Sequence, residues 1–503
     1  MAEPFYITTA ISYPNGPPHI GHAYEAIAAD AMARFQRQQG RDVRFQTGTD
    51  EHGLKMAQAA RSEALEPRVF ADEMSRLFQE MCDTLNVSYD RFIRTSQPDH
   101  YRASQAIWKA MEERGDLYLD RYEGWYSVRD EAYYEEDELR LADDGSKLSP
   151  HETPVEWTVE ESWFFRLSKY QQPLLDHYAA NPSFIRPESR RNEVVRFVEG
   201  GLKDLSISRT SFDWGVPVPG SGSHVMYVWL DALTNYITGL GYPDDTELWR
   251  RYWPANVHLI GKDVVRFHAV YWPAFLMSAG IALPKQVYGH GFLLSRGEKM
   301  SKSVGNVVDP MALAGTFGVD ALRYFLLREV TFGQDGTYSP EAIVARANAE
   351  LANSFGNLAQ RTLSMIHKNL DGILPAPGEA HDDLELAALV TTAVTKEMPR
   401  AFNNFAFSVG IEAWLRAVFA CNQYVDAQAP WSLRKEEPTR MAEVLGTLWN
   451  CIRALTVAIA PIIPESAEKL LTLIGAGEGG APIPQPTPLF PRLELPEDEE
   501  TAA

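Results

Sequence analysis

The stretch from Phe5 to Gly53 contains a strand, a helix and a second strand, and this order constrains the fold more than any other feature of the sequence. Residues Phe5 to Ile11 are apolar and rich in β-forming side chains. Residues Ile20 to Gln39 carry apolar side chains at a helical period and stop at Gly40. Val43 to Thr47 then alternates as a strand does. The order predicts a βαβ unit, in which a right-handed crossover joins two parallel strands.

Two loops follow the predicted strands, one from Tyr13 to His22 and the other from Gly48 to Gly53. In an open parallel sheet, ligands bind beyond the carboxyl ends of the strands. We therefore expect both loops to contribute to one binding site.

Later segments continue this pattern. Val257 to Ile260 has the composition of a buried strand, and Gln286 to Leu294 predicts another. Between the two halves, Tyr118 to Trp163 has short alternating runs rich in aromatic and acidic residues, which predict a small β-rich insertion. From Ser339 onward the period is almost wholly helical. The predicted fold class is α/β: a Rossmann-type parallel-sheet domain, an inserted small β-rich domain and a C-terminal all-α helical bundle.

Length and composition exclude several classes of protein. The chain has 503 residues, 45% hydrophobic and 23% charged, which is typical of a globular protein, and that length corresponds to about three domains. Its three cysteines lie far apart, which argues against a disulfide framework and against a cysteine-based zinc site.

Met1 to Pro4 lacks the features of a signal peptide, and the apolar stretch from Ala454 to Pro464 is too short to span a bilayer. We therefore expect a cytoplasmic protein with no membrane partner. A net charge of −21 argues against nonspecific coating of nucleic acid.

His19 and His22 stand three residues apart where the first loop enters the predicted helix. This spacing directs both imidazoles and the first unbonded backbone N–H groups of the helix at one spot, which suits an anion. Gly21 allows a ligand to approach the backbone closely. Taken alone, the His-x-Gly-His pattern can also occur by chance.

Lys299 and Lys302 flank Met300 and Ser301 in a segment of small and polar residues. Two ammonium groups on such a loop can close over a polyphosphate and neutralise the charge that develops as pyrophosphate leaves. An isolated lysine pair would be interpreted as a solvated surface loop.

Together and in this order, the two segments match the two signature sequences of class I aminoacyl-tRNA synthetases, and their surroundings resemble the methionyl-tRNA synthetase family. The similarity covers nearly the whole chain: Ala10 to His22, Gly48 to Gly53, Gly201 to Gly215, Val228 to Tyr236, Ile260 to Asp263, His290 to Asn306 and the helical end. The resemblance implies activation of L-methionine by ATP, with Mg²⁺, followed by transfer of methionine to tRNA(Met), initiator and elongator.

The resemblance also implies roles for individual residues. The catalytic donors would be His19, His22, Lys299 and Lys302, with Gly21, Gly261 and Asp263 also at the ATP. Catalysis would consist of positioning and charge stabilisation, without a covalent enzyme intermediate. Asp50 would hold the ammonium group of methionine.

Aromatic residues at helical spacing suit the thioether of methionine. Trp229, Ala232 and Tyr236 share one helix face, and aromatic walls match a flexible, polarizable side chain. Without the resemblance, such a stripe would be interpreted as ordinary core. The family pattern adds the remaining positions of the predicted methionine site: Ala10, Ile11, Tyr13, Leu233 and His290. Tyr13 and His290 would offer polar groups to the sulfur.

A second recognition surface is predicted in the helical end. Asn353, Asn357 and Arg361 repeat every four residues, so they share a helix face. Trp431 lies further along the chain, where an exposed indole could stack on an unpaired base. The resemblance implies that these residues read the CAU anticodon of the tRNA; by themselves they would indicate a polar helix face and a buried tryptophan.

The resemblance divides the chain into five segments. These are the first half of the catalytic domain (1–115), a connective insertion (116–223), the second half of the catalytic domain (224–295), a linker with the lysine loop (296–345) and the anticodon-binding bundle (346–503). Because the chain ends shortly after the bundle, we expect a monomer.

The insertion departs from the family pattern. Many relatives carry cysteine pairs for zinc here, whereas this chain has Ser127 and Asp130 at the positions of one such pair. Structural zinc takes four nitrogen or sulfur ligands, which His151 alone cannot replace. We therefore predict an insertion without zinc or another metal, held by aromatic packing and hydrogen bonds.

Three alternatives remain open. Another class I synthetase, for leucine, isoleucine or valine, would need a large editing insertion, and one for cysteine would need zinc ligands that select a thiol. A small-molecule nucleotidylyltransferase would share the histidine turn but have no use for the helical end. A tRNA-binding protein without catalysis would not need the intact histidines and lysines.

Overall fold

A computed structural model describes residues 2–130, 132–142, 144–295, 298–300, 307–477 and 479–496, with only the backbone of residues 122, 132, 160, 298 and 299. The chain forms two compact units. The first contains Met1–Pro18, Gly40–Asp83 and Ser88–His290, and the second contains His19–Gln39, Thr84–Val87 and Gly291–Ala503.

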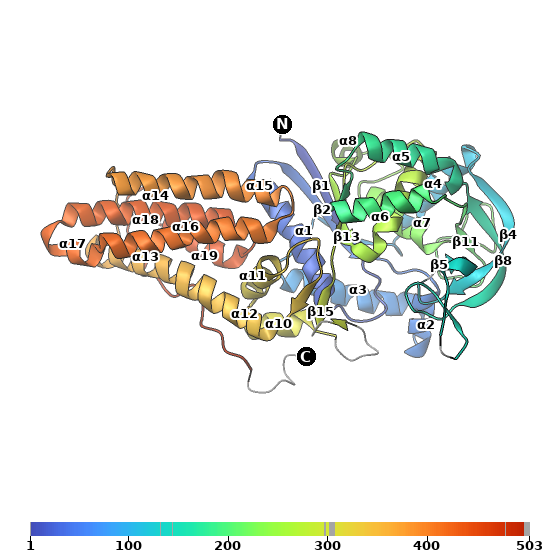
Figure 1. Ribbon diagram of the computed structural model, residues 1–503, viewed down its shortest axis with the longest axis horizontal. Helices are drawn as coiled ribbons and strands as arrows, with labels where there is room; N and C mark the ends of the chain where they lie inside the picture. Colours follow the sequence, from blue (N-terminus) through green and yellow to red (C-terminus); the bar gives the residue numbers. More distant parts are fainter. Residues whose placement is uncertain are drawn as a thin grey trace. The chain divides into compact units, whose positions relative to one another are not determined.

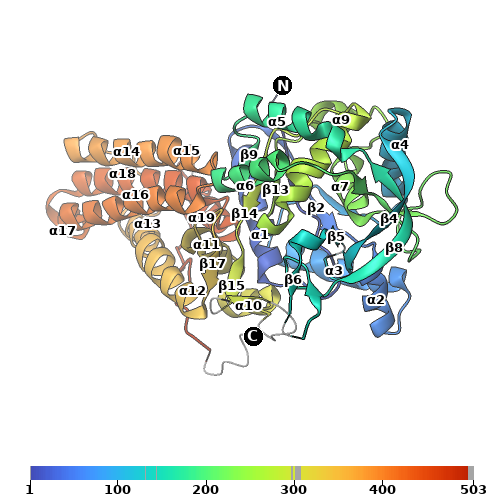
Figure 2. The same ribbon diagram turned by 45° about the vertical axis from the view of Figure 1, so that its right-hand side comes forward.

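The first unit is built on a six-stranded parallel sheet (Figures 1 and 2). In spatial order its strands are β3 (Arg91–Arg94), β2 (Asp42–Thr49), β1 (Pro4–Thr9), β13 (Val257–Gly261), β14 (Val287–His290) and β9 (Ile185–Arg186). The strand order reverses between β1 and β13, so their carboxyl ends flank the point where such sheets bind ligands. The predicted parallel sheet is therefore confirmed.

The strands and their connections match the sequence pattern closely at the amino end. The predicted helix from Ile20 to Gln39 is α1 (Ile20–Gln38), and the two predicted strands around it are β1 and β2. Gly48 is required in β2, because a Cβ at this position would lie 1.9 Å from the carbonyl oxygen of Ile93 in β3. The predicted strand from Gln286 to Leu294 is instead two strands, β14 and β15 (Leu293–Ser295), which belong to different sheets.

The predicted β-rich insertion is present. Its main feature is a long antiparallel ribbon of β4 (Leu117–Ser127) and β8 (Glu156–Phe165), visible as a curved pair of arrows in Figure 2. The strands β5 (Ala132–Tyr134) and β10 (Leu205–Ser206) flank it. The stretch between β8 and β10 also contributes β9 to the edge of the parallel sheet, so part of the predicted insertion belongs to the central sheet.

Helices and shorter strands complete the first unit. The helices are α2 (Leu54–Ser62), α3 (Pro67–Thr84), α4 (Pro98–Glu113), α5 (Gln171–Ala180), α6 (Glu188–Glu199), α7 (Val228–Thr238), α8 (Glu247–Tyr252) and α9 (Trp272–Ala279). The short strand pairs are β6 (Arg140–Leu141) with β7 (Lys147–Leu148), and β11 (Ser208–Arg209) with β12 (Val225–Met226). The core joins α4, α7 and α9 through buried residues that include Trp108, Tyr236 and Phe275.

The second unit is mostly helical, as predicted. Figure 1 shows its long helices running side by side. They are α13 (Asn357–Asn369), α14 (His381–Thr392), α16 (Phe407–Gln428), α18 (Pro438–Ile459) and α19 (Pro464–Gly475). Shorter helices are α10 (Pro310–Phe317), α11 (Val319–Glu329), α12 (Pro340–Arg346), α15 (Met398–Phe402) and α17 (Pro430–Glu436), and a small sheet joins β15 to β16 (Glu298–Lys299) and β17 (Gly336–Tyr338).

Helix α18 is long and apolar enough to cross a membrane, and it is the only such helix among the described residues. However, 61% of its most apolar window is buried inside the structure. It packs against α13, α14, α16, α17 and α19. Its apolar character is therefore that of a central bundle helix.

A buried ion pair anchors α1 within the second unit. The Arg323 side chain, fully buried on α11, donates to Asp30 of α1 at 2.6 Å. It also donates to carbonyl oxygens of Leu85, Pro461 and Ile462 at 3.0–3.1 Å. A buried charge is costly unless it is paired and hydrogen-bonded, and Arg323 satisfies both conditions. The helix that follows the histidine turn is thereby joined to the α18–α19 connection of the bundle.

Candidate active site

The two histidines cap the amino end of α1. His19 is the N-cap residue, and its Nδ1 accepts from the backbone N–H of Gly21 at 3.1 Å. The Nδ1 of His22 accepts from the backbone N–H of His19, also at 3.1 Å. The two rings lie against each other, with their centroids 3.9 Å apart. The predicted turn therefore brings both imidazoles together at the helix end.

These contacts determine where the ring protons lie. Because a backbone N–H can only donate, each Nδ1 is an acceptor, and each neutral ring carries its proton on Nε2. Burial lowers the pKa of His22 well below its ordinary value, and the nearby His19 lowers it further. His22 is therefore a neutral Nε2–H donor at neutral pH.

The helix end itself favours an anion. The first turn of α1 contains no acidic residue, so nothing offsets the positive end of the helix dipole. Gly21 has a more specific role than predicted, because a Cβ there would lie 2.8 Å from Cε1 of His19. A larger residue would displace the His19 ring from its capping position. The backbone N–H groups of His19, Ile20, Gly21 and His22 already donate within the structure, so the turn is suited to bind phosphate through its Nε2–H donors and the helix dipole.

The lysine segment follows the hairpin of β15 and β16. Lys299 is the last residue of β16, in register with Leu294. The side chain of Lys299 and all of Lys302 lie outside the described residues. The catalytic roles of both lysines stay predictions.

The loop after β2 is held by contacts from several parts of the first unit. The backbone N–H of Asp50 donates to the carbonyl of Ser12 at 2.8 Å. Glu51 is fully buried and accepts from Arg94 at 2.7 and 3.1 Å and from Ser96. The Trp214 indole donates to the carbonyl of Glu51 at 2.5 Å. Asp50 is itself buried, so the predicted ammonium-binding carboxylate lies on a loop that these contacts hold.

The chain after β1 lies next to this loop. Ala10 and Ile11 are half-buried, and Ala10 donates its N–H to Leu259 of β13 at 3.1 Å. The Tyr13 hydroxyl donates to the carbonyl of His52 at 2.9 Å and accepts from the N–H of Met56 at 3.2 Å. Its hydrogen is therefore used within the loop, and its contact with methionine stays a prediction.

Helix α7 presents the predicted aromatic face. Trp229 is half-buried and stacks on Phe267, with ring centroids 3.6 Å apart and an angle of 7°. Tyr236, Ala232 and Leu233 are buried on the same helix. Phe267 begins a π-helical turn (Phe267–Tyr271) just before α9, a local irregularity that often marks functional sites.

His268, which sequence reasoning missed, is one of two imidazoles against Tyr236, together with His258, whose ring stacks on that of Tyr236 with the centroids 4.0 Å apart. Nε2 of His268 lies 2.6 Å from the Tyr236 hydroxyl, and its Nδ1 lies 2.9 Å from the carbonyl of Val264. The carbonyl can only accept, so Nδ1 carries the proton and Nε2 accepts from Tyr236. Burial lowers the pKa of His268 to about 4, against the opposing effect of the Val264 carbonyl, so the ring is neutral at neutral pH. A lone histidine within an apolar helix was the available sequence signal.

His290 lies elsewhere on the sheet. It ends β14, is 5% exposed, and is in register with Gly261 at the end of β13. Gly261 is the predicted adenosine position, and a Cβ there would lie 2.7 Å from Oδ1 of Asp263. His290 therefore lies beside Gly261, at the carboxyl ends of the neighbouring strands β13 and β14. Its contact with methionine stays a prediction.

The predicted anticodon residues divide into two pairs. Asn353 and Asn357 are exposed, the first in a π-helical stretch (Ala347–Gly356) and the second at the start of α13. Arg361 places its guanidinium 5.4 Å from the ring centroid of Trp431, which is 49% exposed on α17. Arg361 also lies 3.6 Å from Asp426. The structure thus brings Arg361 and Trp431 together on the bundle surface.

A hydrogen-bonded cluster surrounds Ser127 and Asp130, the two positions where the sequence departs from the expected cysteine pair. Oδ2 of Asp130 accepts from Ser149 and Thr153 at 2.6 Å and from Tyr134 at 2.9 Å. Ser127 lies 2.6 Å from Thr153. The cluster adds one imidazole, with Nδ1 of His151 3.6 Å from Asp130, but hydroxyl groups, one engaged carboxylate and one imidazole do not supply the four nitrogen or sulfur ligands of a structural zinc. The three cysteines are buried and lie outside the insertion.

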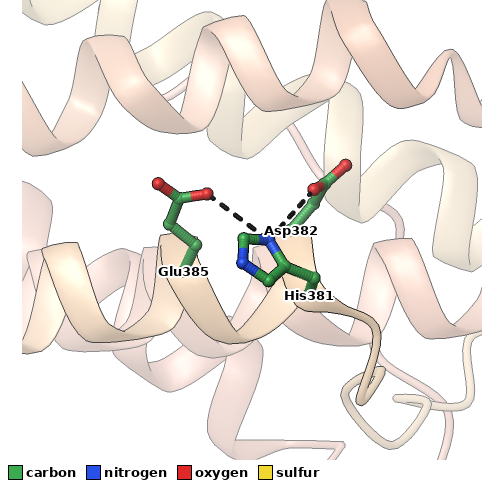
Figure 3. Close-up of side chains that lie close together, drawn as sticks. All are labelled: His381, Asp382 and Glu385. Atoms are coloured by element: carbon green, nitrogen blue, oxygen red, sulfur yellow. Dashed lines mark ion pairs between the residues drawn. The ribbon is translucent and has the colours of Figure 1, made fainter.

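One other cluster has metal-type side chains. Among the described residues, His381, Asp382 and Glu385 form the one such group of three, at the start of α14 (Figure 3). Nδ1 of His381 lies 3.6 Å from Asp382 and 3.7 Å from Glu385. All three are exposed, and acidic groups in a first turn stabilise the helix dipole. We interpret the cluster as a solvated helix start.

Two family models match this chain. The model for "tRNA synthetases class I (M)" matches residues 5–143 and 136–363. The model for the "Anticodon binding domain of methionyl tRNA ligase" matches residues 376–486. The second match covers α14 to α19 and includes Trp431, whereas Asn353, Asn357 and Arg361 lie within the first.

Similar proteins and structures share nearly the full length of the chain. A methionine–tRNA ligase of Brucella suis is 57% identical over 97% of this chain and 98% of its own length. One from Mycobacterium bovis is 55% identical over 99% of both chains. The solved structure of Mycobacterium tuberculosis methionyl-tRNA synthetase in complex with methionyl-adenylate superposes with a TM-score of 0.94, at 55% identity, over 97% of this chain and 100% of that one.

We predict that Asp130→Asn destabilises the insertion. Burial alone would raise the pKa of Asp130, but hydrogen bonds from His151, Ser149, Thr153 and Tyr134 lower it below its ordinary value. The ionised cluster is therefore fully stabilising above pH ~4, the ordinary Asp pKa, and the stabilisation is lost as the pH falls below it. The variant should cost about 1–3 kcal/mol at pH 7.

Hydrogen exchange of the β4–β8 ribbon at pH 7 and at about pH 2, below the ordinary Asp pKa, measures this effect. Wild-type protection should fall between the two pH values by more than that of the variant. Asp144→Asn, which removes an exposed carboxylate that caps Ser146, is the control and should change protection little. Equal protection in wild type and Asp130→Asn at pH 7 would contradict the role of the cluster.

Proposed function

Because this chain belongs to the methionyl-tRNA synthetase family of class I tRNA ligases, we propose that it activates L-methionine with ATP and transfers it to the 3′ end of tRNA(Met). The family membership rests on a match to most of the chain and on 55–57% identity over nearly its whole length. The observation that carries the proposal at the site is the capped histidine turn, with both Nδ1 atoms used as acceptors.

The first reaction forms methionyl-adenylate. A carboxylate oxygen of methionine attacks the α-phosphorus of ATP, a new O–P bond forms, and the bond to pyrophosphate breaks. His19 and His22 donate Nε2–H hydrogen bonds to the phosphates beside the positive end of α1. Lys299 and Lys302 neutralise the leaving pyrophosphate. Mg²⁺ would be held mainly by the phosphates of the nucleotide and would supply further charge neutralisation there.

The methionine itself is held by two groups of residues. Asp50 pairs with its ammonium group, on a loop that Ser12 and Trp214 hold in place. The side chain lies against Trp229 and Phe267, with Tyr236 and His268 behind them. Because the Tyr236 hydrogen is directed to His268, this wall offers the sulfur a polarizable surface without a strong donor. Ala10, Ile11, Tyr13, Ala232, Leu233 and His290 complete the methionine site, while Gly261 and Asp263 lie toward the adenosine.

The second reaction transfers methionine to tRNA. A hydroxyl oxygen of the terminal ribose attacks the carbonyl carbon of the adenylate, an ester bond forms, and AMP leaves with the electron pair of the broken C–O bond. Asn353, Asn357, Arg361 and Trp431 read the CAU anticodon on the bundle. We also propose that the enzyme acts as a cytoplasmic monomer.

The activation step predicts a specific exchange reaction. ATP–pyrophosphate exchange with each of the twenty amino acids should proceed with methionine and be near background with the others. His22→Ala should lower the exchange rate by about 10²- to 10³-fold, because one preorganised donor to the phosphates is lost. Exchange that depends on leucine or valine and not on methionine would overturn the proposed substrate.

The anticodon surface predicts a different outcome for Trp431→Ala. Stacking of a base on an aromatic ring contributes about 1–3 kcal/mol, so kcat/KM for tRNA charging should fall by about 5- to 150-fold. ATP–pyrophosphate exchange without tRNA should remain unchanged. The control is Phe419→Ala, which removes a similarly exposed aromatic side chain (45%) from α16. Equal charging losses in both variants would contradict a specific role for Trp431.

The insertion is proposed to take no zinc. Its hydroxyl and carboxylate cluster is an unsuitable donor set, and Asp130 is already engaged by three hydroxyl groups. Elemental analysis of protein purified without chelator should give far less than one zinc per chain, and a chelator should not change the unfolding midpoint. Stoichiometric zinc would contradict this proposal.

A further inference from the structure

A buried carboxylate on α7 joins the two groups of residues proposed to bind methionine. Asp231 lies between Trp229 and Ala232 in the first turn of the helix and has no exposed surface. Its Oδ2 accepts from Nδ1 of His52 at 2.7 Å, and its Oδ1 accepts from Nε2 of His100 at 2.6 Å. The proposed reaction gives neither Asp231 nor His100 a role.

His52 is attached to three separate elements. It follows Asp50 by two residues, and its ring donates through Nδ1–H to Asp231 on α7. Its Nε2 lies 3.0 Å from the Tyr101 hydroxyl of α4. Burial, followed by the charge of Asp231, raises the pKa of Tyr101 to about 12, so this hydroxyl keeps its hydrogen at neutral pH. The carbonyl of His52 accepts from Tyr13.

His100 connects α4 to both ends of α7. Its Nε2 donates to Asp231 in the first turn, and its Nδ1 lies 3.1 Å from the hydroxyl of Thr238, the last residue of the helix. The ring is fully buried. Contacts at both ends determine how α7 lies along α4, and with it the direction of the Trp229 face.

The energetic cost of this arrangement indicates a positional role. A buried charge must be desolvated, and an apolar core of the same volume is often at least as stable. Burial alone would raise the pKa of Asp231, but His52 and His100 lower it to about 2, so the carboxylate is ionised throughout the neutral range. A satisfied buried network of this kind favours one geometry over its neighbours.

We infer that Asp231 and His100 are positioning residues for methionine, which hold the Asp50 loop at a fixed separation from the Trp229 and Tyr236 face of α7. This inference rests on the proposed function and adds to it. The ammonium group and the thioether of one substrate must be bound at the same time, so the separation between their two binding groups determines affinity. Neither positioning residue contacts the substrate.

The main experiment measures ATP–pyrophosphate exchange for Asp231→Asn. The amide replaces one acceptor oxygen with a donor, so one histidine loses its partner. The KM for methionine should rise by about 10- to 100-fold, while the KM for ATP changes by less than about twofold. A KM for methionine that stays at the wild-type value would overturn the inference.

Asp116→Asn is the matched control. Asp116 is equally buried in the same unit and accepts from Lys169 at 2.6 Å, from Ser278 at 2.8 Å and from Tyr170. It should lose thermal stability without a change in either KM. If it raised the KM for methionine as much as Asp231→Asn, the effect would be general destabilisation and the inference would fail.

Two competitive inhibitors test the separation directly. L-Methioninol keeps the ammonium group, and 4-(methylthio)butan-1-ol lacks it. Asp231→Asn should weaken the first inhibitor strongly and the second little, because only the first must reach both binding groups. Equal losses for the two inhibitors would overturn the inference.

A conservative pair of variants covers the case in which Asp231→Asn folds poorly. In His100→Gln the amide nitrogen can donate to Asp231, so the KM for methionine should stay near the wild-type value. In His100→Leu the KM for methionine should rise as it does in Asp231→Asn. Identical KM values for His100→Gln and His100→Leu would contradict the role of the contact between His100 and Asp231. Wild-type exchange tests the proposed function separately: absence of methionine-dependent exchange in the wild type would refute that function, whereas the variants bear only on the inference.

Discussion

Strand β1 pairs with β2 on one side and with β13 on the other, and the position of every candidate residue in the first unit follows from this double pairing. Parallel pairing aligns the carboxyl ends of the three strands. Ala10, Asp50 and Gly261, far apart in the sequence, therefore emerge from one edge of the sheet. The reversal of strand order between β1 and β13 leaves this edge open for a ligand. Gly48 permits the close approach of the neighbouring strand β3.

Buried charges then orient the elements that the sheet brings together. In the first unit, Asp231 connects α7, α4 and the Asp50 loop through two imidazoles. In the second, Arg323 connects α1 to α11 and to the α18–α19 connection. Apolar packing tolerates small displacements, whereas a desolvated charge loses much of its stabilisation when a partner moves. Helix α7, with the proposed methionine face, and helix α1, with the two histidines, are therefore each held by a buried ion pair that tolerates little displacement.

Sequence reasoning identified the sheet, the capped turn and the aromatic face of α7, because each depends on residues close together in the chain. It failed where partners are distant. His268 reaches Tyr236 from a π-helical turn that no periodicity indicated. Nor did sequence reasoning indicate that the Tyr13 hydroxyl donates to the carbonyl of His52 in the loop after β2. The absence of cysteines in the insertion was evident from the sequence. The hydroxyl groups of Ser149 and Thr153, however, lie 19 and 23 residues after Asp130, and only folding brings them to its carboxylate.

By itself, the sequence determined the class of fold, the histidine turn at the start of α1 and the membership of a tRNA ligase family, because strand and helix periods and short motifs are local properties of the chain. Tertiary structure decided which side chains hydrogen-bond to one another and which of the two partners donates. Tautomers at His22 and His268, the direction of the Tyr236 hydrogen and the charge on Asp231 all depend on donors and acceptors supplied by other elements. Hydrogen bonds are directional and short, so their partners are defined only after the chain has packed.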